Sequence, residues 1–333
     1  MRVGLSLPHY GFSLPGGSPI SFEACAAWAE RAEALGFDSV WVSDHFFYAF
    51  DRYGGDPAPI ASLEPLSTLA GIARRTRRVR LGTLVLAAPF RPPALLARAA
   101  ATLDALSGGR LELGVGAGWF EREFEAFGYR FGTVGERFAR LEACLEVLAA
   151  LGGAEPGRAV RLEGPTPLRD ARLLPAPVQR PLPVWVGGKG GPRLLRLAAR
   201  LAGGWNVVWR VAPHAYAARL ADVAAACAEV GRDPATFRRS VGLYALIGED
   251  ERDARALYDL ARASMPGGAL DAEDHEVWCA DTLSGGPERV LERVAAFEAL
   301  GVEELIVAPW VLPFAVPMPE LVERVAEVVI GRR

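Results

Sequence analysis

The amino-acid sequence predicts a single (β/α)₈ barrel, and three observations lead to that fold. Eight short apolar runs rich in β-branched residues alternate with helical patterns, which is typical of parallel strands buried on both faces. The 333 residues suit one α/β barrel, a domain type that commonly exceeds ~250 residues. A doubly wound sheet is the alternative, but no GxGxxG motif follows the first strand and opens a helix.

The expected elements alternate strictly along the chain. Several helical patterns begin near a proline, whose missing N–H is harmless in the first turn, and several end at a glycine. The expected strands span residues 2–8, 39–43, 79–85, 111–116, 183–187, 205–209, 240–247 and 304–309. The expected helices span residues 21–35, 64–75, 93–106, 135–151, 192–201, 213–230, 288–300 and 317–330.

Two connections are longer than barrel loops usually are. Residues 152–180 are rich in proline and arginine and precede the fifth strand. Residues 249–287 precede the eighth strand and contain a further helical pattern at 250–265. Because neither has a linker composition and no internal repeat is visible, we expect one domain over residues 1–333 with two insertions.

Composition excludes several classes of protein. The net charge of −3 argues against a nucleic-acid binder, which would carry a basic excess. No apolar stretch reaches the ~18 residues that span a membrane, and the first residues resemble a strand rather than a signal peptide. The cysteines are scattered without a CxxC pair, and three lie in alanine-rich helical patterns typical of buried thiols. We therefore expect a cytoplasmic protein with no metal site and no membrane or nucleic-acid partner.

The active site of such a barrel lies at the carboxyl ends of its strands, so the residues there are the candidates. They combine two of the four histidines with aromatic side chains and two glycine-rich loops. This combination favours a large, flat, phosphorylated cofactor. In chain order the candidates are His9, Tyr10, Asp44, His45, Phe46, Thr83, Leu84, Gly116, Ala117, Gly118, Trp119, Gly187, Gly188, Lys189, Gly190, Gly191 and Trp310.

The loop GGKGGP, residues 187–192, carries the clearest chemical signal. It follows a strand and opens a helix, so backbone N–H groups, the helix dipole and one cation converge on it. Lys189 is the only lysine among 37 basic residues. An ordinary strand-to-helix turn is the alternative, but we favour anion binding. The loop is not a P-loop, because the GK[ST] order is absent.

Asp44 and His45 form a candidate acid–base pair. A histidine ring can exchange a proton with a bound ring near neutral pH, and Asp44 can orient it or contact a hydroxyl group. The alternative is a polar pair that caps the second strand. The residues alone leave both interpretations open.

Four segments together resemble the luciferase-like monooxygenase superfamily, in particular its coenzyme F420-dependent branch. They are DSVWVSDH, VRLGTLVL, AATLDALSGGRLELGVGAGW and PVWVGGKGGPRLLRLAARLAGGWN, which occur in the expected order over nearly the whole chain. The resemblance implies a barrel that binds F420, which we favour, or FMN in its carboxyl-terminal mouth. It also implies a homodimer.

The same resemblance implies roles for individual residues. Asp44 and His45 would contact the cofactor ring or assist proton transfer, with His45 the proton carrier. His9 would join the cofactor site, and Thr83 and Leu84 would form the bulge behind the ring, often with a non-prolyl cis peptide. The remaining residues group by role: residues 187–191 would hold the phosphate, Gly116, Ala117 and Gly118 would line the cofactor, and Tyr10, Phe46, Trp119 and Trp310 would shape the substrate pocket.

The sequence departs from the family pattern after the fourth strand. Phe120 follows Trp119 where the family often has asparagine, and Trp119 aligns with the catalytic glutamate of the sugar-phosphate dehydrogenases. That activity is therefore in doubt, and Trp119 suggests a small substrate that is apolar or aromatic. The carboxylates of Glu121, Glu123 and Glu125 are interpreted as a solvated helix face.

The leading hypothesis is an oxidoreductase that moves a hydride to or from an organic substrate through F420 or FMN. With FMN it would be a monooxygenase that acts on paired donors. The alternatives are a barrel lyase or isomerase that holds a substrate phosphate in the GGKGG loop, and a non-catalytic flavin-binding relative.

Overall fold

The computed structural model describes residues 1–331, and its central feature is a closed barrel of eight parallel strands. Each strand pairs in parallel with its neighbours, and pairing between the sixth and seventh strands closes the ring. The predicted barrel is confirmed. In chain order the strands are β1 (Arg2–Ser6), β2 (Ser39–Val42), β3 (Arg80–Thr83), β5 (Leu111–Gly116), β8 (Val184–Gly187), β9 (Gly204–Trp209), β10 (Arg238–Ile247) and β12 (Glu304–Ala308).

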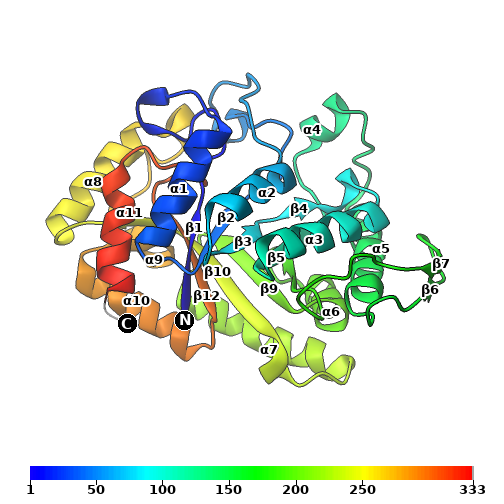
Figure 1. Ribbon diagram of the computed structural model, residues 1–333. Coiled ribbons are helices and arrows are strands. Elements are labelled where there is room, and N and C mark those ends of the chain that lie inside the picture. Colours follow the sequence, from blue (N-terminus) through cyan, green and yellow to red (C-terminus); the bar gives the residue numbers. More distant parts are fainter. Residues whose placement is uncertain (332–333) are drawn as a thin grey trace.

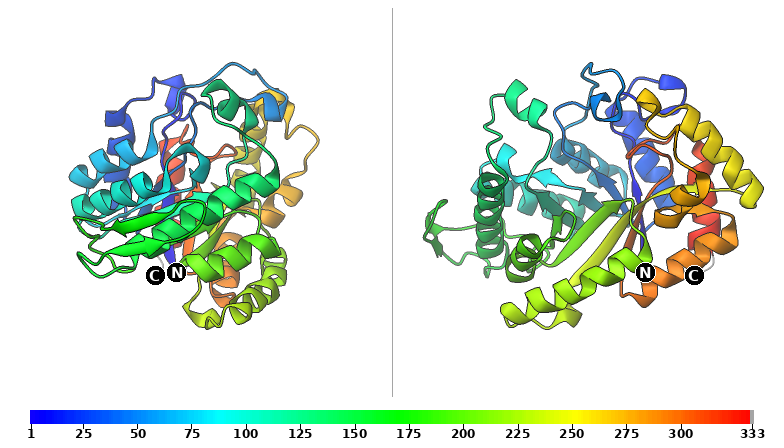
Figure 2. Two further views of the ribbon diagram at one scale, coloured as in Figure 1. Left: turned by 90° about the vertical axis from the view of Figure 1, so that its right-hand side faces the viewer. Right: turned by 180° about the vertical axis from the view of Figure 1, so that it is seen from behind.

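Helices surround the barrel on its outside (Figures 1 and 2). Helix α1 begins behind Ser21, whose hydroxyl accepts the N–H of Ala24, and α5 begins with a capping box between Thr133 and Glu136. The helices of the ring are α1 (Phe22–Ala34), α2 (Pro65–Arg75), α3 (Pro93–Ser107), α5 (Val134–Gly152), α6 (Pro192–Leu201), α7 (Pro213–Glu229), α10 (Pro287–Ala299) and α11 (Pro319–Val325).

The first strand ends at Ser6 rather than at residue 8, and two other predicted elements differ in their course. The third strand does not run to residue 85: it ends at Thr83, and the chain re-enters the sheet as β4 (Leu86–Ala87), which pairs with β5. The last helix does not continue evenly to residue 330, because after α11 it widens into a π-helical turn at Ala326–Ile330.

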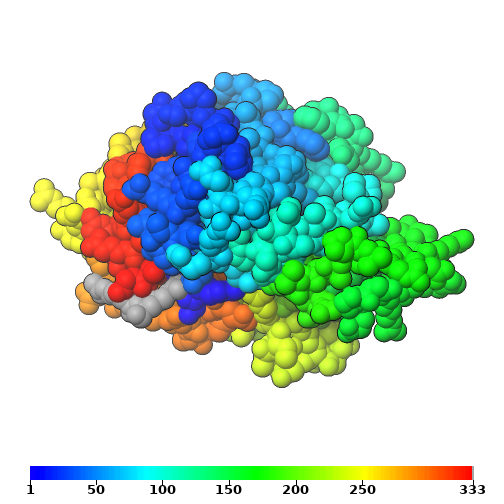
Figure 3. Space-filling view, viewed as in Figure 1, coloured from blue at the N-terminus to red at the C-terminus, as the bar shows by residue number. Residues whose placement is uncertain are grey.

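The long connections carry structure of their own. Residues 152–180 contain the antiparallel hairpin of β6 (Val160–Leu162) and β7 (Leu168–Ala171), which stands out from the rounded body (green, right; Figures 1 and 3). Residues 249–287 form α8 (Glu251–Ala263), α9 (His275–Asp281) and β11 (Leu283–Gly285), which adds to the edge of β10. A separate short helix, α4 (Glu121–Ala126), follows β5.

The amino-terminal end of the barrel is closed by a buried charge cluster and large rings. Glu112 lies fully buried on β5 and accepts from Arg80 at 2.6 Å, Arg238 at 3.1 Å and the Trp185 indole at 2.7 Å. Gly82 leaves room for the Trp41 ring, since a Cβ there would lie 2.1 Å from it. The interior of the barrel is therefore filled with side chains near its amino-terminal end.

The described residues contain no helix long and apolar enough to cross a membrane. The three cysteines in alanine-rich helical patterns, Cys25, Cys144 and Cys227, are buried, which confirms that prediction.

Candidate active site

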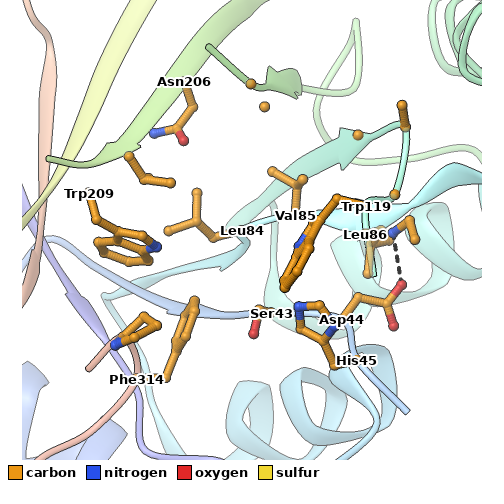
Figure 4. Close-up of a pocket in the computed structure, with 18 of the residues that line it drawn as sticks. Ser43, Asp44, His45, Leu84, Val85, Leu86, Trp119, Asn206, Trp209 and Phe314 are labelled. Carbon is orange, nitrogen blue, oxygen red and sulfur yellow. Dashed lines mark hydrogen bonds between the residues drawn. The ribbon is translucent and has the colours of Figure 1, made fainter. Parts of the chain in front are cut away.

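A cavity of about 450 Å³ opens at the carboxyl-terminal ends of the strands. Figure 4 shows Leu84 and Val85 at its centre, with Trp209 and Phe314 on one side and Trp119 and His45 on the other. Most of the lining is apolar, while Asp44, His45 and Lys189 supply charged or titratable groups. The cavity therefore brings together most of the predicted candidates.

His45 is paired with Glu123, not with Asp44. The loop after β2 carries His45 to the cavity, and its Nδ1 lies 3.0 Å from Oε1 of Glu123 on α4. Glu123 also accepts the N–H of Phe46 at 3.0 Å, and its side chain is only 2% exposed. The interpretation of Glu123 as part of a solvated face is therefore wrong, although Glu121 and Glu125 are exposed. Because the partner that buries Glu123 lies 78 positions away in the chain, the helical pattern alone does not distinguish Glu123 from Glu121 and Glu125.

Asp44 holds the backbone around the cavity. Its carboxylate accepts two hydrogen bonds from Arg91, at 2.5 and 3.0 Å, and one from the N–H of Ala87 at 2.9 Å, which is dashed in Figure 4. Burial alone would lower the pKa of Arg91, but Asp44 and Glu64 outweigh it and raise that pKa. The predicted role of Asp44 as the orienter of His45 is replaced by a role in fixing β4.

The floor of the cavity is the segment between β3 and β4. The Leu84–Val85 peptide is cis, next to the Thr83–Leu84 position that the resemblance implied. Leu84 lines the cavity, but Thr83 does not: its buried hydroxyl donates to the carbonyl of Gly114 and accepts its N–H, both at 2.8 Å. Thr83 is thus a link between two strands rather than a cofactor contact.

Glycines at the ends of two strands let Val85 pack closely in the floor of the cavity. Gly116, Ala117 and Gly118 line the cavity from the β5 end, and Gly187 and Gly188 line it from the β8 end. A Cβ at Gly116 would lie 2.8 Å from Val85, and a Cβ at Gly187 would lie 2.7 Å from it. Any side chain at Gly116 or Gly187 would therefore displace Val85 from the floor.

Lys189 lines the same end of the cavity, immediately before α6. The N-cap residue of α6 is Gly191, which provides no side-chain cap, so the positive end of the helix dipole and the ammonium group act together. Gly190 and Gly191 lie outside the lining, and Gly190 packs over the ring of Trp205. The first half of the GGKGG loop therefore lines the cavity, and the second half shapes the turn.

His9 is buried behind the cavity wall and does not reach the cavity. Its Nδ1 donates to the carbonyl of Leu7 at 2.9 Å, and its Nε2 accepts the N–H of Ser43 at 3.2 Å. Burial lowers the pKa of His9 to about 4, so the ring is neutral. In front of it Tyr10 lines the cavity, as predicted, and hydrogen-bonds the Ser43 hydroxyl.

The predicted substrate residues divide into two groups. Trp119 lines the cavity and is half exposed at its mouth. Phe46 does not line it, because its ring stacks on Phe127 at 4.1 Å, and Trp310 lies in a separate buried cluster.

Several residues that line the cavity were not among the site residues predicted from the sequence. Trp209 and Asn206 lie on β9, whose carboxyl end was recognised but offered no motif. Arg52, Tyr53, Tyr244 and Phe314 lie in loops or late in a long strand, where no periodicity marks them. Within the described chain, no group of three or more His, Cys, Asp and Glu side chains is placed to hold a metal ion.

The family model described as luciferase-like monooxygenase matches residues 1–304. An F420-dependent glucose-6-phosphate dehydrogenase of Amycolatopsis mediterranei is 39% identical over 180 residues, which cover 54% of this chain and 51% of that protein. The chain therefore matches only about half the length of that relative. A phthiodiolone/phenolphthiodiolone dimycocerosates ketoreductase of a Mycobacterium species is 34% identical over 273 residues, covering 78% of this chain and 69% of that protein.

Among solved structures, a monooxygenase from Streptomyces bottropensis superposes with a TM-score of 0.75 at 26% identity, covering 100% of this chain and 99% of that one.

Proposed function

The chain belongs to the luciferase-like monooxygenase family, and on that premise we propose that it is an oxidoreductase that uses coenzyme F420 to move a hydride to or from a small organic substrate. The observation that carries the proposal is that one cavity holds two chemically different groups. These are Lys189 in the loop before α6 and the ring of His45, which is held by Glu123. The relatives named for F420 support that cofactor.

The floor of the cavity and the Lys189 loop fit a flat ring with an anionic tail. Leu84 and Val85 offer an apolar surface for the ring, and Gly116 and Gly187 let Val85 hold its place in that surface. Lys189 and the start of α6 would hold the phosphate. Bound F420 supplies a two-electron hydride donor or acceptor.

His45 is the residue that would carry the proton. Because Glu123 occupies Nδ1, the other ring nitrogen is left for a substrate oxygen. When a substrate alcohol is oxidised, Nε2 can take the hydroxyl proton, and in the reverse direction it can return a proton to the carbonyl oxygen. Glu123 would position the ring and balance its charge.

Trp119, Trp209 and Phe314 support an apolar or aromatic substrate, because large rings form the walls on both sides of the floor. From the family resemblance we also propose a cytoplasmic homodimer. Sedimentation of the purified protein tests the dimer.

Fluorescence titration with F420 and with FMN tests the cofactor. We expect saturable binding of F420 that is tighter than binding of FMN. Single-turnover reduction of bound F420 should then be about 10²- to 10⁴-fold slower in His45→Ala than in the wild type, the usual contribution of a general acid–base. Failure to bind either cofactor, or a wild-type rate in His45→Ala, contradicts the proposal.

The likeness to a monooxygenase structure supports a second candidate, FMN-dependent monooxygenation. It predicts tighter binding of FMN than of F420, together with substrate-dependent oxygen consumption when reduced FMN is supplied.

A further inference from the structure

Arg52 is a charged residue of the cavity that the proposed chemistry does not use. It lies in a short 3₁₀ turn after β2, at Asp51–Tyr53, and lines the cavity. Its guanidinium carbon lies 4.6 Å from the centre of the Trp119 ring and 4.9 Å from that of Tyr53. Contacts with ring faces consume no hydrogen-bond acceptor, so the N–H groups of Arg52 are not satisfied by them.

Two arginines that contact the segment after β2 have carboxylate partners. Arg122 binds Asp51 at 2.8 Å, and Arg91 binds Asp44 and Glu64. Within residues 1–331, by contrast, no carboxylate lies at ion-pair distance from Arg52. Arg52 is exposed to solvent, so its charge is open to a group that enters the cavity.

The tyrosines that line the cavity with Arg52 carry no compensating negative charge. The hydroxyl groups of Tyr48 and Tyr53 hydrogen-bond each other at 3.0 Å. Burial raises the pKa of Tyr48 and also that of Tyr244, so both phenols stay neutral. These hydroxyl groups can donate or accept hydrogen bonds but cannot neutralise the guanidinium group.

The cavity that Arg52 lines also has an aromatic wall. Trp209 stacks on Tyr244 with ring centres 5.5 Å apart, and Phe314 meets Trp209 edge-on at 5.4 Å. All three line the cavity, and so does Arg52. A flat aromatic group packed against this wall would lie in the same cavity as the cation of Arg52.

We propose that Arg52 determines substrate specificity by binding a carboxylate attached to a flat aromatic ring. This inference rests on the proposed function, because it names the substrate class of the same site. The planar fork of an arginine matches a planar carboxylate with two parallel hydrogen bonds, which a neutral amide cannot reproduce.

Isothermal titration with 2-naphthoate and 2-naphthamide tests the proposal, because the two probes share ring and shape and differ in charge. The wild type, with and without F420, should bind the naphthoate about tenfold or more tightly than the amide, as expected for a charged hydrogen-bonded pair. Arg52→Gln should abolish that preference. Arg122→Gln, which removes a nearby arginine already paired with Asp51, should retain it.

Equal affinities in the wild type, no measurable binding of naphthoate, or a preference that survives in Arg52→Gln would overturn the proposal. Titration of Arg52→Gln with F420 distinguishes a role of Arg52 in substrate binding from a role in cofactor binding. An unchanged affinity for F420 supports the substrate role. If the variant loses affinity for F420 but still prefers the naphthoate, Arg52 binds the cofactor, and the proposal is overturned. If the wild type fails to bind F420, the proposed cofactor is wrong, while the comparison of the two naphthyl probes still decides the role of Arg52.

Discussion

Nδ1 of His45 lies 3.0 Å from Oε1 of Glu123, although the two residues are 78 positions apart in the chain. The other carboxylate oxygen accepts the N–H of Phe46, so one buried side chain fixes both the ring of His45 and the backbone behind it. Helix α4 follows the glycine-rich end of β5 and places the carboxylate of Glu123 beside His45. The pair therefore couples the second and fourth strand ends of the barrel.

Glu123→Gln should lower kcat by roughly 10- to 100-fold while KM changes little, because the amide preserves shape but no longer balances a proton on His45. Steady-state kinetics with a substrate found by screening measures this. Glu121→Gln on the exposed face of the same helix is the control and should behave as the wild type. A wild-type kcat in Glu123→Gln would show that Glu123 serves only the fold.

The barrel could be predicted from sequence because its signal is repeated. Eight apolar runs alternate with helices, and their limits follow from the residues that end them, as at β5, where the expected range 111–116 is also the observed one. Errors occur where the chain leaves this regularity, as at Thr83, where the strand breaks off and resumes at Leu86.

The candidate site was predictable only where a residue type and its neighbours in the sequence indicate a chemical role. Lys189 among glycines and His45 after β2 are such cases, and both line the cavity. Glu123 and Arg52 were missed because their significance depends on contacts across the mouth of the barrel. A carboxylate is buried or solvated according to the partner that faces it, and one sequence does not reveal that partner.

Lys189→Ala should weaken cofactor binding about tenfold, the lower end of what a charge-assisted contact contributes at an exposed position. The affinity of the wild type should fall with added salt, and that of the variant should fall less steeply, because salt screens the exposed charge. Fluorescence titration at low and high salt measures both affinities.

Arg196→Ala on the outer part of α6 is the control, because Arg196 pairs with Glu229. This variant should bind the cofactor with wild-type affinity. Lys189→Arg with unchanged affinity would mean that only the charge, not the compact ammonium group, matters.

The buried His9 should make stability depend on pH. Its pKa is lowered from 6.5 to about 4 by burial, so between these values the unfolded chain binds a proton that the folded protein does not. Its contribution is complete above pH 6.5 and is lost as the pH falls toward 4. Since a tenfold change in proton affinity corresponds to ~1.4 kcal/mol, roughly 3 kcal/mol of unfolding free energy should disappear over this range.

Urea unfolding at a series of pH values from 7 to 4 measures this loss, on a scale of roughly 3 kcal/mol. His9→Asn, whose amide can still donate to the carbonyl of Leu7, should be less stable at neutral pH but show a shallower pH dependence. His214→Gln removes an exposed histidine and should keep the wild-type slope. An unchanged slope in His9→Asn would place the pH dependence elsewhere.

Gly114→Ala should destabilise the protein and damage the cavity floor together. A Cβ at Gly114 would lie 2.0 Å from the carbonyl oxygen of Thr83, and backbone cannot rotate out of the way as a side chain can. Overpacking of this kind typically costs about 1–3 kcal/mol and occasionally more, and the forced movement of Thr83 would shift the adjoining Leu84. We therefore expect a lower urea midpoint and a weaker affinity for the cofactor in the same variant.

Gly135→Ala is the matched control, because its Cβ would meet only the Thr133 hydroxyl at 3.7 Å. Gly135 lies within helix α5, where alanine is favoured over glycine by up to ~1 kcal/mol. That variant should be as stable as the wild type or more so, with unchanged cofactor affinity. If both substitutions have the same small effect, the contact between Gly114 and Thr83 does not hold the floor in place.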